Sequence, residues 1–282
     1  MTNQETIKYI DIHKIITEGD SKVLKKLPKF IINLVAKIIR QDDMNMTLNK
    51  YSDQNGIRFL PKMIEEFNLT LDISGLDNLP PKGKCFFASN HPFGIIDGLI
   101  LTYIVSQKYG DLKAIGNDAF MFIHQLRPLI AAVNVFGQSS KEYIKALDLV
   151  YHSDIPITHF PAGEVSRNYK RKIEDTVWQK SFITKSILSQ RDIIPFHFHG
   201  KNSRLFYFIY TVRKVLGIKL NLELLLLPRE MFKKRNKTIK VSIGKPISHK
   251  MFNTNYNHFQ WAQKVREYVY NLNNKTINNN FL

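Results

Sequence analysis

From residue 84 onward, short runs rich in β-branched and aromatic residues alternate with stretches that repeat apolar residues at helical spacing. The first kind are KCFFAS, LKAIG, AVNVF, IPITHF, IIPFHFH and TIKVSIG, and the second kind include IIDGLILTYIVSQ, SSKEYIKALDLVYH and residues 176–188. An apolar run also covers residues 222–227. Strands that alternate with helices of about ten or more residues are typical of an α/β protein with a largely parallel sheet. In such folds the chemistry lies in the loops that follow the carboxyl ends of the strands.

The composition is that of a globular protein, and the chain divides into two predicted parts. A chain of 282 residues with 44% hydrophobic residues and one Cys is neither a disordered protein nor a disulfide scaffold. Residues 1–71 are predicted to form a helical N-terminal extension, and residues 72–282 the α/β domain. Because no repeat and no Ser- or Gly-rich linker separates them, we expect the extension to pack on a mixed, mostly parallel sheet flanked by helices.

The strongest periodic element of the extension is SKVLKKLPKFIINLVAKIIR, residues 21–40. Its apolar residues recur at helical spacing, and the remaining face carries Lys and Arg but no acid. Pro28 suits the first turn of a helix better than its interior, which predicts two helical pieces. This pattern fits a basic amphipathic helix lying in an anionic bilayer surface, and it fits equally a helix docked on the protein's own core.

The net positive charge of the chain favours an anionic partner. Against 24 Asp and Glu stand 41 Lys and Arg, a net charge of +17. Nucleic acid, anionic lipid head groups or an acidic carrier protein would each suit it, and a biased genome composition would explain it without a partner. The stretch KNSRLFYFIYTVRKVLGIKL interleaves aromatic and basic residues without the signature of a nucleic-acid module, so we favour a membrane-interface belt and expect no nucleic acid.

Membrane-crossing and secretion signals are missing from the sequence. The first twenty residues mix acids with bases and contain no apolar core of a signal peptide. No apolar run approaches the roughly 18 residues that span a bilayer. The sequence therefore predicts a cytoplasmic protein that can lie on a membrane without crossing it.

The segment most suggestive of chemistry is KCFFASNHPFGIIDGLIL. A strand is expected to end before its polar loop, and a helix to begin after it with Asp97 in the first turn. The loop carries Asn90, His91, Pro92 and Gly94. A carboxylate that holds one imidazole nitrogen leaves the other free as a base, so His91 and Asp97 could activate a substrate hydroxyl or amine directly. The alternative is a structural His beside a helix-start Asp.

A second polar loop lies in THFPAGEVSR, residues 158–167. A strand would enter a Pro-Gly turn at Gly163 and present Glu164, Ser166 and Arg167. An Arg fork at such a place suits a phosphate or a carboxylate, and a solvated loop is the alternative.

Other candidate sites are weaker. His197 and His199 share a strand face and could bind zinc, but no third ligand has the right spacing, so core or acyl-pocket histidines are favoured and no metal is expected. Cys85 is expected to be a buried, inert thiol. No glycine pattern of a nucleotide-binding loop is present.

Several of these segments, in order, resemble the glycerophosphate and lysophospholipid acyltransferase family. SNHPFGIIDG is similar to its first motif, although five residues rather than the common four separate His91 from Asp97. That spacing, and LLLLPREMFKKR, resemble a bacterial subgroup often labelled hemolysin-like and linked to acylated amino-acid lipids. FPAGEVSR resembles the third motif with Ala162 in place of the usual Glu, and IIPFHFHG and VSIGKPIS resemble later motifs. The second motif is only loosely echoed by Gly116 and Arg127.

The resemblance implies a glycerol-3-phosphate acyltransferase-like fold and a membrane-associated O-acyltransferase. It would move a fatty acyl group from acyl carrier protein or acyl-CoA, without a bound cofactor, to the hydroxyl of a lyso-lipid, either a lyso-aminolipid or lysophosphatidic acid. His91 would be the general base and Asp97 would orient it. The acceptor would be held by Gly163, Glu164, Ser166 and Arg167, and the loop supported by Asn90, Pro92 and Gly94. The protein would lie on the inner face of the cytoplasmic membrane; the alternative is a non-catalytic basic protein that binds lipid or nucleic acid.

Overall fold

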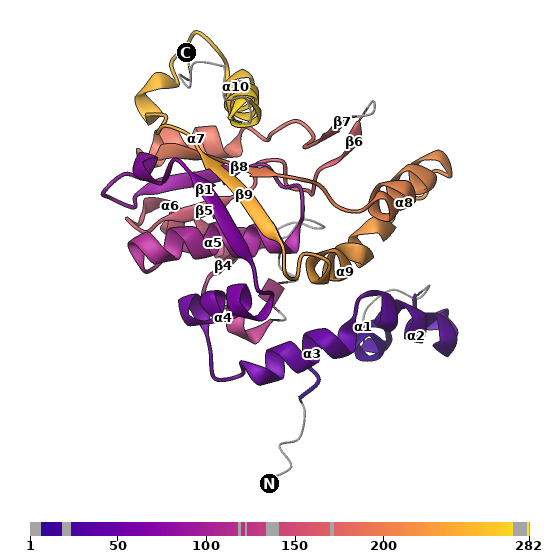
Figure 1. Ribbon diagram of the computed structural model, residues 1–282. Helices are drawn as coiled ribbons and strands as arrows, with labels where there is room; N and C mark the ends of the chain where they lie inside the picture. Colours follow the sequence, from indigo (N-terminus) through magenta and orange to yellow (C-terminus); the bar gives the residue numbers. More distant parts are fainter. Residues whose placement is uncertain are drawn as a thin grey trace.

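A seven-stranded sheet forms the centre of the fold (Figure 1). The computed structural model describes residues 7–18, 24–117, 120–121, 123–133, 141–169, 172–272 and 281. The strands are β1 (Thr70–Ser74), β2 (Cys85–Ser89), β3 (Lys113–Asn117), β4 (Ile130–Val133), β5 (Ile157–His159), β8 (Asp192–His199) and β9 (Thr238–Ile243). Their order is β1-β9-β8-β2-β5-β3-β4, and all neighbours are parallel except β8 and β9. The predicted mixed, mostly parallel sheet is confirmed.

Helices cover both faces of the sheet, because its central strands are apolar on both sides. All of β2 is buried, as is typical of a strand in a sheet that helices cover on both faces. Alternate side chains enter different cores: Phe87 packs with α4 (Phe59–Glu66) and α5 (Ile95–Tyr109), whereas Phe86 packs on the opposite face. That second core is built by α6 (Lys141–His152), α7 (Ser181–Ser189) and α10 (His258–Asn271). Figure 1 shows α4 and α5 on one side of the sheet and α7 and α10 on the other.

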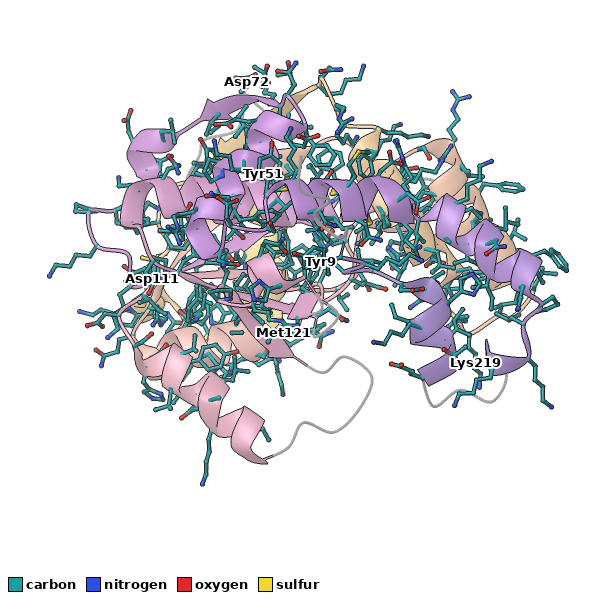
Figure 2. The ribbon with its side chains drawn as sticks, turned by 90° about the horizontal axis from the view of Figure 1, so that it is seen from below. Tyr9, Tyr51, Asp72, Asp111, Met121 and Lys219 are labelled. Atoms are coloured by element: carbon teal, nitrogen blue, oxygen red, sulfur yellow. The ribbon has the colours of Figure 1, made fainter. Side chains whose placement is uncertain are left out.

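The described part of the N-terminal extension is mostly helical and packs on the rest of the fold. Its helices are α1 (Ile12–Glu18), α2 (Lys29–Ile38), α3 (Gln41–Lys50) and α4, and α4 buries Phe59, Leu60 and Met63 in the core beside α5. The predicted border before residue 72 falls inside β1, which already pairs with β9. Seen from below, α1 to α3 extend from Tyr51 toward the end of the molecule that carries Lys219 (Figure 2).

The helical stretch around Pro28 is interrupted at that residue, as the sequence predicts. A 3-10 turn, η1 (Leu24–Lys26), precedes it, and Pro28 caps α2, while residues 21–23 lie outside the described residues. α2 buries Ile32 but leaves Phe30 70% and Leu34 54% exposed. The helix is therefore docked on the protein and still presents apolar side chains outward. None of the helices in the described part of the chain combines the length and apolar character needed to cross a bilayer.

Several elements were not predicted from the sequence. The antiparallel hairpin β6 (Arg167–Tyr169) and β7 (Lys172–Glu174) has strands too short to show periodicity, and α8 (Arg204–Val215), α9 (Leu227–Phe232) and α10 were not predicted. α7 begins later than expected, the run at 222–227 forms the 3-10 helix η6 (Leu222–Leu226), and residues 134–136 of AVNVF lie outside the described residues. The remaining 3-10 turns are η2 (Gly56–Arg58), η3 (Leu76–Asn78), η5 (His124–Leu126) and η7 (His249–Met251).

Candidate active site

His91 lies just beyond the carboxyl end of β2, in the loop that leads to α5. Because β5 is the parallel neighbour of β2, the loop after β5 lies beside it. The His91 ring stacks on Phe160 from that second loop, with ring centroids 4.0 Å apart and planes 26° apart. The two polar loops singled out in the sequence thus meet at one edge of the sheet.

Asp97, in the first turn of α5, is fully buried against this loop. His91 Nδ1 lies 3.1 Å from Asp97 Oδ1, although the direction of approach leaves the hydrogen bond incomplete. Such bonds in unliganded sites tighten when substrate binds. The backbone N–H groups of Phe93 (2.8 Å), Gly94 (3.2 Å) and Gly98 (2.9 Å) all donate to the carboxylate. Asp97 is therefore fixed in place before any substrate arrives.

The predicted supporting residues hold this loop in shape. The Asn90 amide pairs with the backbone of Phe198 on β8 in both directions, donating to its carbonyl (3.0 Å) and accepting from its N–H (2.7 Å). Gly94 has φ +90°, and a Cβ there would lie 2.8 Å from a methyl of Leu227. A side chain at that position would be both strained and crowded. Pro92 is buried in the same loop.

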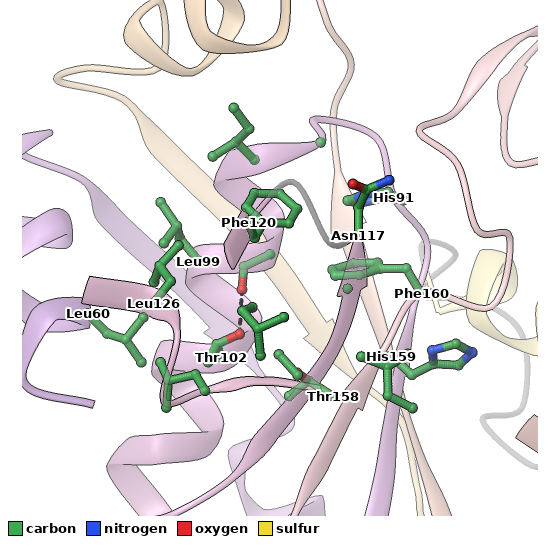
Figure 3. Close-up of a pocket in the computed structure, with 18 of the residues that line it drawn as sticks. Leu60, His91, Leu99, Thr102, Asn117, Phe120, Leu126, Thr158, His159 and Phe160 are labelled. Carbon is green, nitrogen blue, oxygen red and sulfur yellow. Dashed lines mark hydrogen bonds between the residues drawn. The ribbon is translucent and has the colours of Figure 1, made fainter. Parts of the chain in front are cut away.

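An apolar cavity of about 180 Å³ opens beside His91 (Figure 3). Residues of α5 and of β3, together with Phe120, Leu126, Leu129 and Ile130, form most of its wall, and Leu60 of α4 closes it at the end away from His91. Asn117, at the carboxyl end of β3, lines the cavity at the same end as His91 and was not singled out from the sequence. Gly116 also lines the cavity, whereas Arg127 donates to the carbonyl of Met121.

The second polar loop divides into exposed and buried residues. Gly163 lines the apolar cavity, and Glu164 lines a polar hollow of about 580 Å³ between the β6–β7 hairpin and α8. Tyr169 donates to the Glu164 carboxylate (3.3 Å), and Lys214 and Lys219 line the same hollow. This turn therefore separates an apolar space from a polar one.

Ser166 and Arg167 differ from the expectation that they face the acceptor, because each is 1% exposed. The Ser166 backbone N–H donates to the carbonyl of His91 (2.8 Å). Arg167 Nε donates to Glu223 (3.1 Å), which also pairs with Arg213 (2.5 Å), and Arg167 Nη1 donates to the carbonyl of Val165. Packing of β6 against α8 thus turns the predicted Arg fork into a buried ion-pair triad.

Asp175 is the residue that sequence reasoning missed most plainly. Its carboxylate accepts from the Ser166 hydroxyl (2.6 Å), the Trp178 indole (2.9 Å) and the backbone N–H of His91 (3.1 Å). It lies 84 residues from His91 in the chain, so no local spacing links the two. Asp175 therefore links the two polar loops by hydrogen bonds to His91 and Ser166.

The histidines of β8 lie outside the cavity lining. Burial, with a smaller effect of His199, lowers the pKa of His197 to about 3, so this side chain stays neutral. In the described residues no group of three His, Cys, Asp or Glu side chains could hold a metal ion. Burial raises the pKa of the Cys85 thiol to about 12, which fits the inert role expected for it.

Several known proteins are similar to this chain. Residues 14–279 match the family described as Acyltransferase. A lyso-glycine lipid O-acyltransferase of Phocaeicola vulgatus is 40% identical over 269 residues, which cover 95% of this chain and 96% of that protein. The protein of the same name from Bacteroides thetaiotaomicron is 39% identical, with 95% and 99% covered. Among solved structures, the chain is similar to the 1-acyl-sn-glycerophosphate acyltransferase of Thermotoga maritima, with 13% identity, 79% and 81% coverage and a TM-score of 0.48.

The buried triad generates a stability prediction. Glu223→Gln removes the one carboxylate between Arg167 and Arg213 and should lower the free energy of unfolding by about 3–5 kcal/mol, because both guanidinium groups stay buried. Urea denaturation followed by circular dichroism measures it. The control Glu65→Gln breaks an exposed pair with Lys62 and should leave that free energy nearly unchanged. Equal effects of the two variants would contradict the structural role of the triad.

Proposed function

The chain belongs to the acyltransferase family, and from this premise we propose that it transfers a fatty acyl group from a thioester to the hydroxyl of a single-chain lipid. The observation that carries the proposal is His91, with Nδ1 3.1 Å from Asp97, in the wall of an apolar cavity. The similarity to proteins named lyso-glycine lipid O-acyltransferase favours a lyso-glycine lipid over lysophosphatidic acid as the acceptor. It also favours an enzyme over the non-catalytic binding protein that the charge alone allows.

The proposed chemistry is direct transfer without an acyl-enzyme. His91 Nε2 takes the proton of the acceptor hydroxyl while its oxygen attacks the thioester carbonyl carbon. Asp97 orients the ring and stabilises the imidazolium that forms. When the tetrahedral intermediate collapses, the carbon–sulfur bond breaks, and the thiolate recovers the proton from His91. The products are an ester and a free thiol, so no electrons or further groups are needed.

The acyl chain of the donor is proposed to enter the apolar cavity. Leu60, Leu99, Leu126 and Leu129 line it, so an acyl chain would replace water-exposed surface with apolar contacts. Thr102 lies in the same wall and donates its hydroxyl to the carbonyl of Gly98 (2.7 Å), which leaves its methyl group available to the chain. Acyl-CoA and acyl carrier protein present the same thioester, and the net charge of +17 would attract either.

The head group of the acceptor is proposed to lie on the other side of the turn formed by Gly163 and Glu164. With Ser166 and Arg167 buried, Gly163 and Glu164 are the two predicted acceptor residues that border open space. Lys214 and Lys219 in the adjoining hollow would attract a carboxylate such as that of a glycine head group.

The membrane surface is proposed to meet α2 and α8, which both contact η6 at one end of the molecule (Figure 1). Phe30 and Leu34 on α2, and Phe208 (63%), Val215 (80%) and Leu216 (67%) on or just after α8, are exposed. Exposed apolar side chains beside basic ones are typical of a surface that enters the head-group layer of an anionic bilayer. The exposed basic residues nearby in the sequence are Lys25, Lys26, Lys29, Lys37, Arg204, Lys214 and Lys219.

The catalytic proposal is tested by acyl transfer in detergent micelles with acyl-CoA and acyl carrier protein donors. The acceptors are lyso-glycine, lyso-ornithine and lysophosphatidic lipids. His91→Ala should lower kcat by about a hundred- to ten-thousand-fold, because the general base is lost. The control is His249→Ala, since His249 also pairs with an Asp, Asp192 (2.8 Å), but does not line the cavity. Near wild-type turnover of His91→Ala would refute the mechanism.

The acyl-chain proposal is tested at Thr102, which is 6% exposed and borders the cavity. Thr102→Phe should lower kcat/KM about tenfold or more with a hexadecanoyl donor and little with an octanoyl donor, because the larger side chain overpacks the space that only the longer chain needs. Thr102→Val, which keeps the size, should leave the chain-length preference unchanged. Equal losses for both donors in Thr102→Phe would show that the chain binds elsewhere.

The membrane proposal is tested with the double variant Phe30→Glu and Val215→Glu. Sedimentation with vesicles that contain phosphatidylglycerol should show binding weakened about tenfold or more, since two apolar contacts are replaced by negative charges. Leu149→Glu on α6 is the control, because Leu149 is 74% exposed but lies away from α2 and α8. If the double variant binds as well as the control, another surface faces the membrane.

A further inference from the structure

We propose that Asp175 is a positioning residue that fixes the loop of His91 and stabilises the protonated form of His91 during transfer. This inference rests on the proposed role of His91 as general base. No motif includes Asp175, and it does not line the cavity, so it would act through His91 and not on the substrate.

The contacts of Asp175 place it between the two loops of the site. Oδ1 accepts from the backbone N–H of His91 and from the Ser166 hydroxyl, and Oδ2 accepts from the Trp178 indole. The Ser166 N–H in turn donates to the carbonyl of His91, so both backbone groups of His91 are held. The backbone position of His91 therefore depends on the Asp175 carboxylate and on Ser166, which the same carboxylate holds.

Asp175 is buried, so its negative charge is weakly screened by solvent. It is 1% exposed, and among the described residues no Lys or Arg side chain forms an ion pair with its carboxylate. Burial raises its pKa, and the donors from Ser166, Trp178 and His91 oppose that rise. All three polar contacts donate to the carboxylate oxygens, which is the pattern that an ionised group accepts. A buried negative charge is poorly screened and favours a positive charge nearby.

The other charged or titratable groups around Asp175 come from α10 and from Glu174, the last residue of β7. The Tyr270 hydroxyl accepts from the Asp175 backbone N–H (2.7 Å), and Arg266 donates to the Asp175 carbonyl (2.6 Å). Arg266 also pairs with Glu174 (3.1 Å), which offsets its charge. The Asp175 carboxylate contacts His91 at its backbone N–H, and a positive charge on the His91 ring lowers the pKa of Asp175, while Asp97 meets His91 at the ring.

The proposal predicts a shift in the pH dependence of transfer. The base must be neutral to accept a proton, so the acidic limb of the profile of kcat/KM against pH reports the loss of that proton in the free enzyme. Asp175→Asn removes a negative charge that favours the protonated form of the base, so this acidic limb should move to lower pH by about half a pH unit or more. kcat at the optimum should fall about tenfold or more, because Asn cannot accept all three donors.

The matched control is Ser166→Ala. It removes one donor to Asp175 and keeps the negative charge, so it should lower kcat without moving the acidic limb downward. Both profiles are measured on the full chain in detergent micelles, with unfolding midpoints recorded alongside. If Asp175→Asn moves the limb no more than Ser166→Ala does, Asp175 has only a structural role and the proposal is wrong.

A second variant covers the case in which Asp175→Asn does not fold. Asp175→Glu keeps the charge but lengthens the side chain, so kcat should fall with the limb in place. Unchanged kcat in a folded Asp175→Glu variant would overturn the positioning role. The two proposals fail separately: an inactive wild type, or an active His91→Ala variant, refutes the transferase mechanism, whereas an active wild type with an unmoved limb in Asp175→Asn refutes only this inference.

Discussion

The parallel pairing of β2 with β5 is the constraint on which the rest of the site depends. It aligns Ala88 with His159, so the loops that leave the two strands begin side by side. His91 and Phe160 then stack at 4.0 Å, and the cavity opens beside them. The register is stable because β2 is buried on both faces, and a shift by one residue would exchange the two cores. The geometry of the site is therefore a consequence of core packing.

Buried charge keeps this arrangement rigid. Asp97 holds the imidazole side of His91, Asp175 holds its backbone, and Glu223 ties the hairpin that follows the second loop to Arg213 on α8. Each of these carboxylates is satisfied by several donors or by two cations, as a buried anion must be. The triad also connects the site to the helix that presents apolar residues outward. Under the proposed function, the surface that meets the lipid and the loop that does the chemistry belong to one packed unit.

Local pattern was enough to predict the sheet, the place of His91 and Asp97 and the break at Pro28. Alternation of β-type and helical runs identifies buried parallel strands, and loops after such strands gather at one edge. The hairpin of β6 and β7 was not predicted because three-residue strands have no measurable period, and Asp175 was missed because its contact with His91 spans 84 residues of the chain. α10 was missed although its sequence carries a capping box at Asn257 and buried apolar residues at helical spacing. Arg167 was expected to be free, since sequence cannot tell an exposed cation from one paired with Glu223.

The sequence by itself determined the fold class, the family resemblance and the candidate pair for acid–base chemistry, because these depend on periodicity and short spacings that the chain carries locally. Only the tertiary structure decided which polar side chains face open space. In the folded chain Ser166 and Arg167 are buried, and Glu164 lines the polar hollow. Asp175 accepts a hydrogen bond from the backbone of His91. The physical reason is that exposure and pairing are properties of how β6, α8 and α10 pack together, and packing between distant segments leaves no periodic trace in the chain.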